Sequence, residues 1–188
     1  MRSTSLFAAA AFAAGLLASG IAAAADRITI ELTSGPVVIE LSDKAPKHAA
    51  RIKALAAAGA YDNVLFHRVI DGFMAQTGDV RFAKVGGPNF DQAMAGMGGS
   101  DEPDLEAEFS SEPFVRGTVG MARSNDPNSA NSQFFIMFAP APYLDNNYTV
   151  VGKVVEGIEN VDKIKRGDAN NGGVVANPDR MITVTVGG

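Results

Sequence analysis

The chain beyond residue 25 is divided into many short segments with the pattern of β-strands, and this division limits the possible folds more than any other feature. Each segment is four to seven residues long and rich in β-branched or aromatic residues, and glycine, proline, asparagine or aspartate occupies most of the gaps. The eight segments are residues 27–32, 37–41, 64–70, 74–77, 117–122, 132–138, 149–155 and 181–186. Strands of this length and number predict a closed antiparallel barrel or a sandwich.

Two other segments have the residue pattern that is typical of α-helices. Residues 46–58 begin with Pro46, end before Gly59 and contain many alanines, which predicts one amphipathic helix. Residues 157–166 predict a second, shorter helix, because apolar residues recur there at a spacing of three: Ile158, Val161 and Ile164. We therefore expect one mainly β domain over residues 26–188, with two helices.

Residues 1–25 have the pattern of a secretory signal peptide. Arg2 precedes an apolar run from Leu6 to Ala25, and the run ends in small residues that form an A-x-A-like cleavage site before Asp26. This pattern predicts an exported protein, periplasmic or secreted. An uncleaved membrane anchor is the alternative, since about twenty apolar residues can also span a bilayer.

The composition excludes several classes of function. The net charge is −5 at pH 7, and the loss of Arg2 would make it more negative, which is the wrong sign for binding nucleic acid or an anionic membrane. The chain has no cysteine and only two histidines, so we expect no disulfide, no transition-metal site and no cofactor.

The long middle of the chain, residues 80–112, is rich in glycine and acidic residues. The stretch Gly96-Met97-Gly98-Gly99-Ser100 lacks the lysine and the strand-to-helix setting of a phosphate loop, so we expect a surface loop. The acidic residues of 101–112 predict a solvated face, with weak calcium binding as the alternative. For His48, in the first turn of the first helix, we expect an exposed position or one near the helix cap.

Two kinds of hydrolytic site find no support. Ser132 and His67 are present, but no serine lies in a G-x-S-x-G elbow and the chain has no cysteine. The acidic residues lie in a segment that we expect to be solvated, where nothing would separate the pKa values of two carboxyl groups.

Arg68 is an unusual residue, because it lies within an apolar strand segment. The two-residue period of a strand places Arg68 on one face with Phe66 and Ile70, and it groups Met74 with Gln76 on the next strand. It likewise groups Gln133, Phe135 and Met137. For Phe66, Phe134, Ile136 and Phe138 we expect ordinary core packing. For Arg68, spacing leaves open a salt bridge at the rim of a barrel or a binding site.

Residues 66–79, FHRVIDGFMAQTGD, resemble the signature of the cyclophilin family of peptidyl-prolyl cis-trans isomerases. Further blocks resemble the same family in the same order along the chain: Gly120-Met121-Ala122, residues 131–136, Tyr143-Leu144-Asp145 and residues 151–154. The resemblance covers essentially all of residues 26–188. It implies a closed eight-stranded antiparallel β-barrel capped by two α-helices.

The resemblance also implies the roles of individual residues. Arg68 corresponds to the main catalytic side chain of the family. The implied proline pocket consists of Phe73, Met74, Phe135 and Leu144. The implied groups that hold the peptide are Gln76, Gln133 and the backbone of Ala122 and Arg123.

The sequence departs from the animal members of the family at two pocket positions. Tyr143 stands where those members have tryptophan, and Tyr148 stands where they have histidine. Tyrosine can line the pocket, so isomerase activity remains the expectation, but cyclosporin binding is expected to be weak. Residues 81–95 are longer than in simple members, and the sequence suggests no role for them.

The expected function is therefore rotation about X-Pro bonds in folding, proline-containing polypeptides by a monomeric enzyme without a cofactor. A non-catalytic chaperone that binds prolyl peptides on the same barrel is the alternative. A barrel that carries a small apolar ligand inside is a third reading, but an interior filled by Phe, Val and Ile leaves little room for one.

Overall fold

A computed structural model describes residues 26–187, which form a single antiparallel sheet of eight strands. The strands are β1 (Arg27–Leu32), β2 (Gly35–Leu41), β3 (Arg68–Ile70), β4 (Met74–Thr77), β5 (Thr118–Met121), β6 (Phe134–Met137), β7 (Val150–Glu156) and β8 (Thr183–Val186). Each of the eight predicted strand segments overlaps one of these strands, so the mainly β prediction is confirmed. The predicted signal peptide, residues 1–25, lies outside the described residues.

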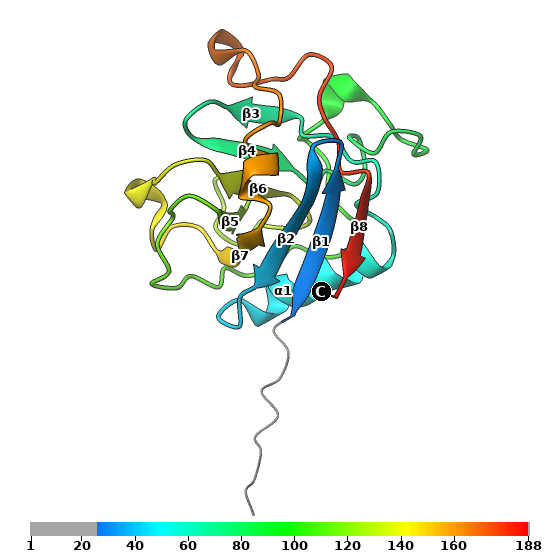
Figure 1. The fold of residues 1–188 in the computed structure, drawn as a ribbon. Helices are drawn as coiled ribbons and strands as arrows, with labels where there is room; N and C mark the ends of the chain where they lie inside the picture. The colour runs from blue at the N-terminus through cyan, green and yellow to red at the C-terminus, as the bar shows by residue number, and fades with distance from the viewer. Residues whose placement is uncertain (1–25, 188) are drawn as a thin grey trace, which may run out of the picture.

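The sheet curls upon itself but its hydrogen-bond ladder stays open. The strand order is β3-β4-β6-β5-β7-β2-β1-β8, so β3 and β8 are the two edges (Figure 1). Residues that precede these edge strands bridge the gap irregularly: Leu65 pairs with Arg180, and the Phe66 N–H donates to the Asp179 carbonyl at 2.8 Å. The prediction of a closed barrel is therefore not confirmed, and residues 64–67 lie outside the regular strand.

The first predicted helix is confirmed and the second is shorter than predicted. Helix α1 (Pro46–Ala57) follows β2 and lies across one end of the sheet (Figure 1), whereas α2 (Ile158–Val161) is a single turn. The Lys165 N–H, which would extend α2, donates instead to the Asp179 carboxylate at 2.8 Å. Three short 3-10 helices complete the chain: η1 (Gln92–Met94), η2 (Pro142–Leu144) and η3 (Ala169–Asn171).

The apolar residues form two separate clusters on the two faces of the sheet. The main core contains Phe66, Phe134, Ile136 and Phe138, as predicted, together with apolar residues of β1, β2, β7, β8 and α1. The second cluster, here called the outer cluster, has seven buried members: Met74, Phe114, Phe135, Met137, Ala141, Leu144 and Val150. Successive residues of β6 alternate between the two clusters, because side chains of a strand point to opposite faces.

The acidic segment 101–112 is only partly the solvated face that its composition predicts. Glu108 accepts hydrogen bonds from the N–H groups of Lys47 and His48 at the start of α1, and from His48 Nδ1 at 2.7 Å. Of the two positions expected for His48, exposed or near the helix cap, the structure shows the second, with the side chain fully buried. Ala45 at the N-cap offers no side-chain acceptor, so a distant carboxylate satisfies the free N–H groups and the helix dipole.

These contacts change the acidity of Glu108. Partial burial by itself would raise the pKa of the Glu108 carboxyl, but hydrogen bonds from the His48 side chain and from the two backbone N–H groups outweigh it, and the pKa lies below its usual value.

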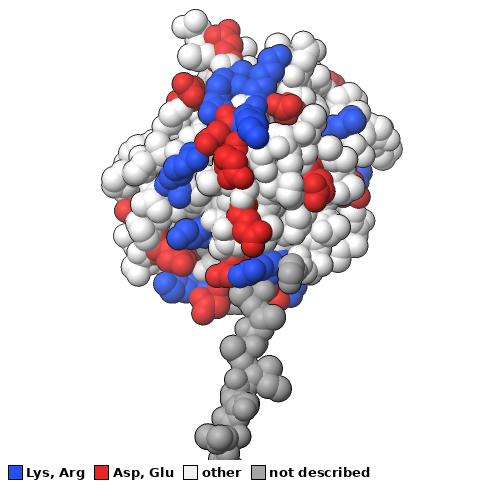
Figure 2. Space-filling model, in the orientation of Figure 1, with Lys and Arg blue, Asp and Glu red and all other residues white. Residues whose placement is uncertain are grey.

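One face of the molecule is mixed in charge. Figure 2 shows basic side chains interspersed with acidic ones on one face of the molecule, with several in contact. Within residues 26–187, no three His, Asp or Glu side chains are grouped so that they could hold a metal ion, and no helix is long and apolar enough to cross a membrane.

Candidate active site

The registers of four neighbouring strands bring Arg68 into line with residues that lie far from it in sequence. Arg68 on β3 pairs with Gln76 on β4, Gln76 pairs with Phe135 on β6, and Phe135 pairs with Gly120 on β5. Paired residues on adjacent antiparallel strands point to the same face. The alternation inferred from the sequence therefore places the cation, the amide and the aromatic ring on one face, beside the outer cluster.

Two hydrogen bonds hold the half-buried Arg68 side chain. Its Nε donates to the Gly172 carbonyl at 3.0 Å, and its Nη1 donates to Gln76 Oε1 at 3.2 Å. No carboxylate forms an ion pair with Arg68 in the part of the chain that the structure describes, which argues against a salt bridge at a barrel rim. Gly172 was missed by the sequence reasoning, because a backbone carbonyl in a loop carries no signal of its partner.

The residues of the implied proline pocket come together in the outer cluster. Met74, Phe135 and Leu144 are buried members, and Phe73, Ala122 and Tyr148 pack against its margin. They come from β4, β6, η2 and the loops beside these elements. An apolar wall therefore lies on the same face as Arg68.

Phe114 is a further wall residue that the sequence reasoning did not identify. Its ring stacks on Phe135 with centroids 5.8 Å apart, and it meets Tyr148 edge to face. Gly120 leaves room for this stack, since a Cβ atom there would lie 2.5 Å from the Phe135 ring and 2.6 Å from the Phe114 ring. Phe114 lies in a loop without strand or helix periodicity, so no pattern marked it.

The two positions that depart from the animal pattern lie at the rim. Tyr143 is 68% exposed and its ring centroid is 6.1 Å from that of Phe73. Tyr148 is more enclosed, with the Arg123 guanidinium 4.2 Å above its ring. Arg123 Nη2 also donates to the Asn147 carbonyl at 2.8 Å, which fixes this rim.

The polar side chains form a chain along the same face. Gln76 Nε2 donates to Gln133 Oε1 at 3.0 Å, and Gln133 Nε2 donates to the carbonyls of Gly96 and Gly98 at 2.9 and 2.8 Å. The backbone of Ala122 adjoins this chain, since its N–H donates to the Gln133 carbonyl. The glycine-rich stretch, predicted to be a plain surface loop, thus borders the site.

Ser132 and His67 form no catalytic pair. The buried Ser132 hydroxyl donates to the Gly78 carbonyl at 2.7 Å. Burial lowers the pKa of His67, because it disfavours the imidazolium more than the nearby Asp79 charge favours it. The structure therefore supports no nucleophile at these residues.

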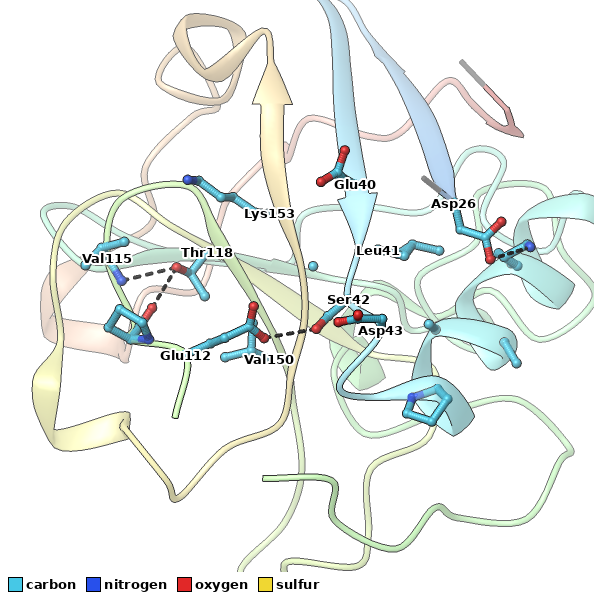
Figure 3. A pocket seen from close by; sticks show the side chains of 16 residues that line it. Asp26, Glu40, Leu41, Ser42, Asp43, Glu112, Val115, Thr118, Val150 and Lys153 are labelled. Carbon is cyan, nitrogen blue, oxygen red and sulfur yellow. Dashed lines mark hydrogen bonds and ion pairs between the residues drawn. The ribbon is translucent and has the colours of Figure 1, made fainter. Parts of the chain in front are cut away.

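A hollow lies elsewhere, between the start of α1, strands β2 and β7, and residues 112–118 (Figure 3). It encloses about 1050 Å³ and shares only Val150 with the outer cluster. Three of its four carboxylates have partners: Glu112 with Ser42, Asp26 with Lys53, and Glu40 with Arg27. No catalytic constellation converges there, so the face that carries Arg68 is the candidate active site.

Comparisons with known proteins show the family to which the chain belongs. The family model described as cyclophilin type peptidyl-prolyl cis-trans isomerase/CLD matches residues 27–186. The chain belongs to the cyclophilin-type peptidyl-prolyl cis-trans isomerase family. It is an enzyme of that class by its match to the family and by its relatives. A probable peptidyl-prolyl cis-trans isomerase from Brucella suis is 58% identical over 187 residues, which cover 97% of this chain and 95% of the relative.

Solved cyclophilin structures have the same fold. Cyclophilin AquaCyp293 from Hirschia baltica has a TM-score of 0.70 at 27% identity, over 85% of this chain and 73% of that chain. A Cryptosporidium parvum cyclophilin, crystallised in the presence of the dipeptide Ala-Pro, has a TM-score of 0.71 at 25% identity, over 86% of this chain and 99% of that chain. The cyclophilin resemblance of residues 66–79 is thus confirmed at the level of family and fold.

Proposed function

We propose that this cyclophilin accelerates rotation about X-Pro bonds in folding polypeptides by binding the twisted amide with Arg68 beside the apolar outer cluster. The observation that carries the proposal is the position of Arg68, a cation without a carboxylate partner among residues 26–187, held by Gly172 and Gln76 on the face of Phe135.

The chemistry of the reaction suits a fixed donor. Rotation about an X-Pro bond must overcome a barrier of about 18–20 kcal/mol, which comes from conjugation between the nitrogen and the carbonyl. As the amide twists, this conjugation is lost and the prolyl nitrogen becomes a hydrogen-bond acceptor. A donor directed at the nitrogen binds the transition state more strongly than the planar ground state. Arg68 can supply it at any working pH, because a guanidinium stays protonated.

The outer cluster has two roles in this proposal. Phe73, Met74, Phe135 and Leu144 would hold the proline ring, and they would exclude water from the face of Arg68, which strengthens its electrostatic effect. The fixed ring lets one side of the amide turn while the other side is held.

The polar groups at the margin would hold the peptide on either side of the proline. Gln76 has a second N–H beyond the one given to Gln133, and it can donate to the carbonyl that rotates. The backbone of Ala122 and Arg123, with Gln133, would anchor the preceding residue. Tyr143 and Tyr148 would form the outer rim.

The test replaces Arg68 with alanine and measures exchange of an Ala-Pro peptide by NMR exchange spectroscopy. We expect kcat/KM to fall at least about a hundredfold, the usual cost of removing one transition-state donor, with little change in unfolding midpoint. Arg27→Ala is the matched control, since Arg27 pairs with Glu40 on β1 and β2. An unchanged exchange rate in Arg68→Ala contradicts the proposal. Peptide binding without accelerated exchange in the wild type would favour the non-catalytic chaperone.

We also propose the partners and the cellular location. The substrates are proline-containing polypeptides, in keeping with the Cryptosporidium parvum neighbour studied with Ala-Pro, and the enzyme works as a monomer with weak cyclosporin binding at most. The pattern of residues 1–25 supports export to the periplasm or beyond. An alkaline phosphatase fusion that is inactive in cells would contradict export.

A further inference from the structure

The loop Gly96-Met97-Gly98 is held from two sides by side chains of different character. Asp79 Oδ2 accepts from the N–H groups of Gly96 and Gly98 at 2.8 and 2.9 Å. Gln133 Nε2 donates to the carbonyls of the same two glycines at 2.9 and 2.8 Å. The peptide groups of this loop therefore connect Asp79 to a side chain of the active site.

Asp79 is fully buried, and it depends on this loop. Its Oδ1 accepts from the N–H groups of Arg81 and Phe82, at 3.0 and 2.9 Å, and its Oδ2 takes the two bonds from the loop. No basic side chain forms an ion pair with Asp79 within residues 26–187. Burying a carboxylate costs free energy unless hydrogen bonds compensate for the lost hydration. Asp79 therefore binds its four backbone donors tightly.

The two glycines of the loop have no room for a side chain. Gly96 has φ +98°, and a Cβ atom there would lie 2.9 Å from the His67 ring. A Cβ at Gly98 would lie 2.5 Å from Asp79 Oδ1. Both positions therefore require glycine, and the two carbonyls that face Gln133 are fixed in place.

These fixed carbonyls determine how the two glutamine amides point. A carbonyl can only accept, so Gln133 must present its NH2 group to the loop and its oxygen to Gln76. Gln76 must then present its NH2 group to Gln133 and its oxygen to Arg68, which can only donate. The chain has an acceptor-only end and a donor-only end, so every orientation along it agrees.

We propose that Asp79 is a positioning residue for the isomerase reaction. It acts through the 96–98 loop, Gln133 and Gln76, and it sets the direction of the Arg68 guanidinium. This inference rests on the proposed role of Arg68. Asp79 itself lies beneath the loop and touches no substrate.

The test is Asp79→Asn, which keeps the volume but turns an NH2 group toward two of the four backbone donors. The charge that binds the four donors is lost, so the loop is held less tightly and the two acceptors of Gln133 are no longer fixed. We expect kcat/KM for the Ala-Pro peptide to fall about tenfold or more, mainly in kcat, since misplacing a catalytic group by about 1 Å can cost a hundredfold. The side-chain amide NMR signals of Gln76 and Gln133 should shift as well.

A double-mutant cycle separates positioning from a general structural effect. In an Arg68→Ala background, Asp79→Asn should lower kcat/KM much less than it does in the wild type, because the part of its effect that passes through Arg68 is already lost. Asp101→Asn is the matched control, since Asp101 is an exposed carboxylate that pairs with the Arg81 side chain, and it should leave the rate unchanged.

The inference about Asp79 and the proposed role of Arg68 would be contradicted by different results. A folded Asp79→Asn enzyme with the wild-type kcat, or an effect that multiplies with that of Arg68→Ala, overturns the inference while the role of Arg68 stands. A wild-type rate in Arg68→Ala alone overturns the proposed function, and the inference with it. If Asp79→Asn does not fold, Gly98→Ala provides the same test, because its Cβ pushes the loop away from an intact Asp79.

Discussion

The main core and the outer cluster share strands β4, β6 and β7 and are buried to nearly the same degree, yet they have different surroundings. Phe134 and Ile136 point into the main core, while their neighbours Phe135 and Met137 point into the outer cluster. All four side chains are 5% exposed or less. Burial alone therefore does not separate structural packing from a binding surface.

The two clusters differ in the residues and elements that surround them. The main core is enclosed by the curled sheet and α1 (Figure 1). The outer cluster borders Arg68, Gln76 and Gln133, whose hydrogen bonds run along one face. An apolar wall beside oriented donors can bind an amide, which a fully enclosed core cannot do.

Two neighbouring substitutions, Phe134→Ala and Phe135→Ala, test whether the main core and the outer cluster have separate roles. Phe134→Ala should lower the free energy of unfolding by about 3–5 kcal/mol, the usual cost of emptying a ring-sized space in a core, with little change in kcat/KM of the folded enzyme. Phe135→Ala should cost less stability, because its space opens toward the surface, and should lower kcat/KM about tenfold or more.

Urea unfolding and peptide exchange, both under conditions where each variant is folded, measure the two effects. Equal losses of stability and equal losses of activity in the two variants would show that the two clusters do not have separate roles.

The second prediction concerns Glu108, on the α1 side of the molecule. Its pKa is lower in the folded chain than in an unfolded one, so its contribution to stability is complete above the unfolded pKa. The contribution is lost as the pH falls through the lowered pKa. Glu108→Gln should therefore reduce the unfolding midpoint at pH 7, and the difference from wild type should shrink as the pH falls through the lowered pKa of Glu108.

Glu106→Gln is the control for this measurement, because the Glu106 side chain is 78% exposed and its ion pair within residues 26–187 is with Lys47. Peptide exchange at pH 7 should be the same in all three proteins, since Glu108 contacts α1 rather than the outer cluster. An acid dependence of Glu108→Gln identical to that of wild type would contradict the prediction.

The smallest expected effect is at the rim of the outer cluster. Tyr143→Trp should leave the unfolding midpoint unchanged, because Tyr143 is 68% exposed. The larger ring and its N–H donor should tighten cyclosporin binding by about 1 kcal/mol, or roughly fivefold. Isothermal titration measures the change, and an unchanged or weaker affinity would show that the rim does not limit binding.

Much of this architecture could be predicted from the sequence. The two-residue period identified the strands, and it separated Phe134 and Ile136 from Phe135 and Met137, because neighbouring side chains of any strand point to opposite faces. Pro46 and Gly59 marked the boundaries of the first helix. The cyclophilin resemblance of residues 66–79 then led to Arg68 and to the family.

The partners of the polar side chains could be identified from the tertiary structure alone. Arg68 binds a carbonyl 104 residues away, and Glu108 satisfies a helix start 60 residues away. Phe114 has no periodic neighbours, and Asp79 is connected to Gln133 through backbone atoms of a loop. Periodicity describes which way a side chain points, whereas the identity of its partner depends on how the sheet curls. The strands and the faces of their side chains therefore follow from the sequence pattern. The polar contacts that orient Arg68 form only when the sheet curls and brings distant residues together.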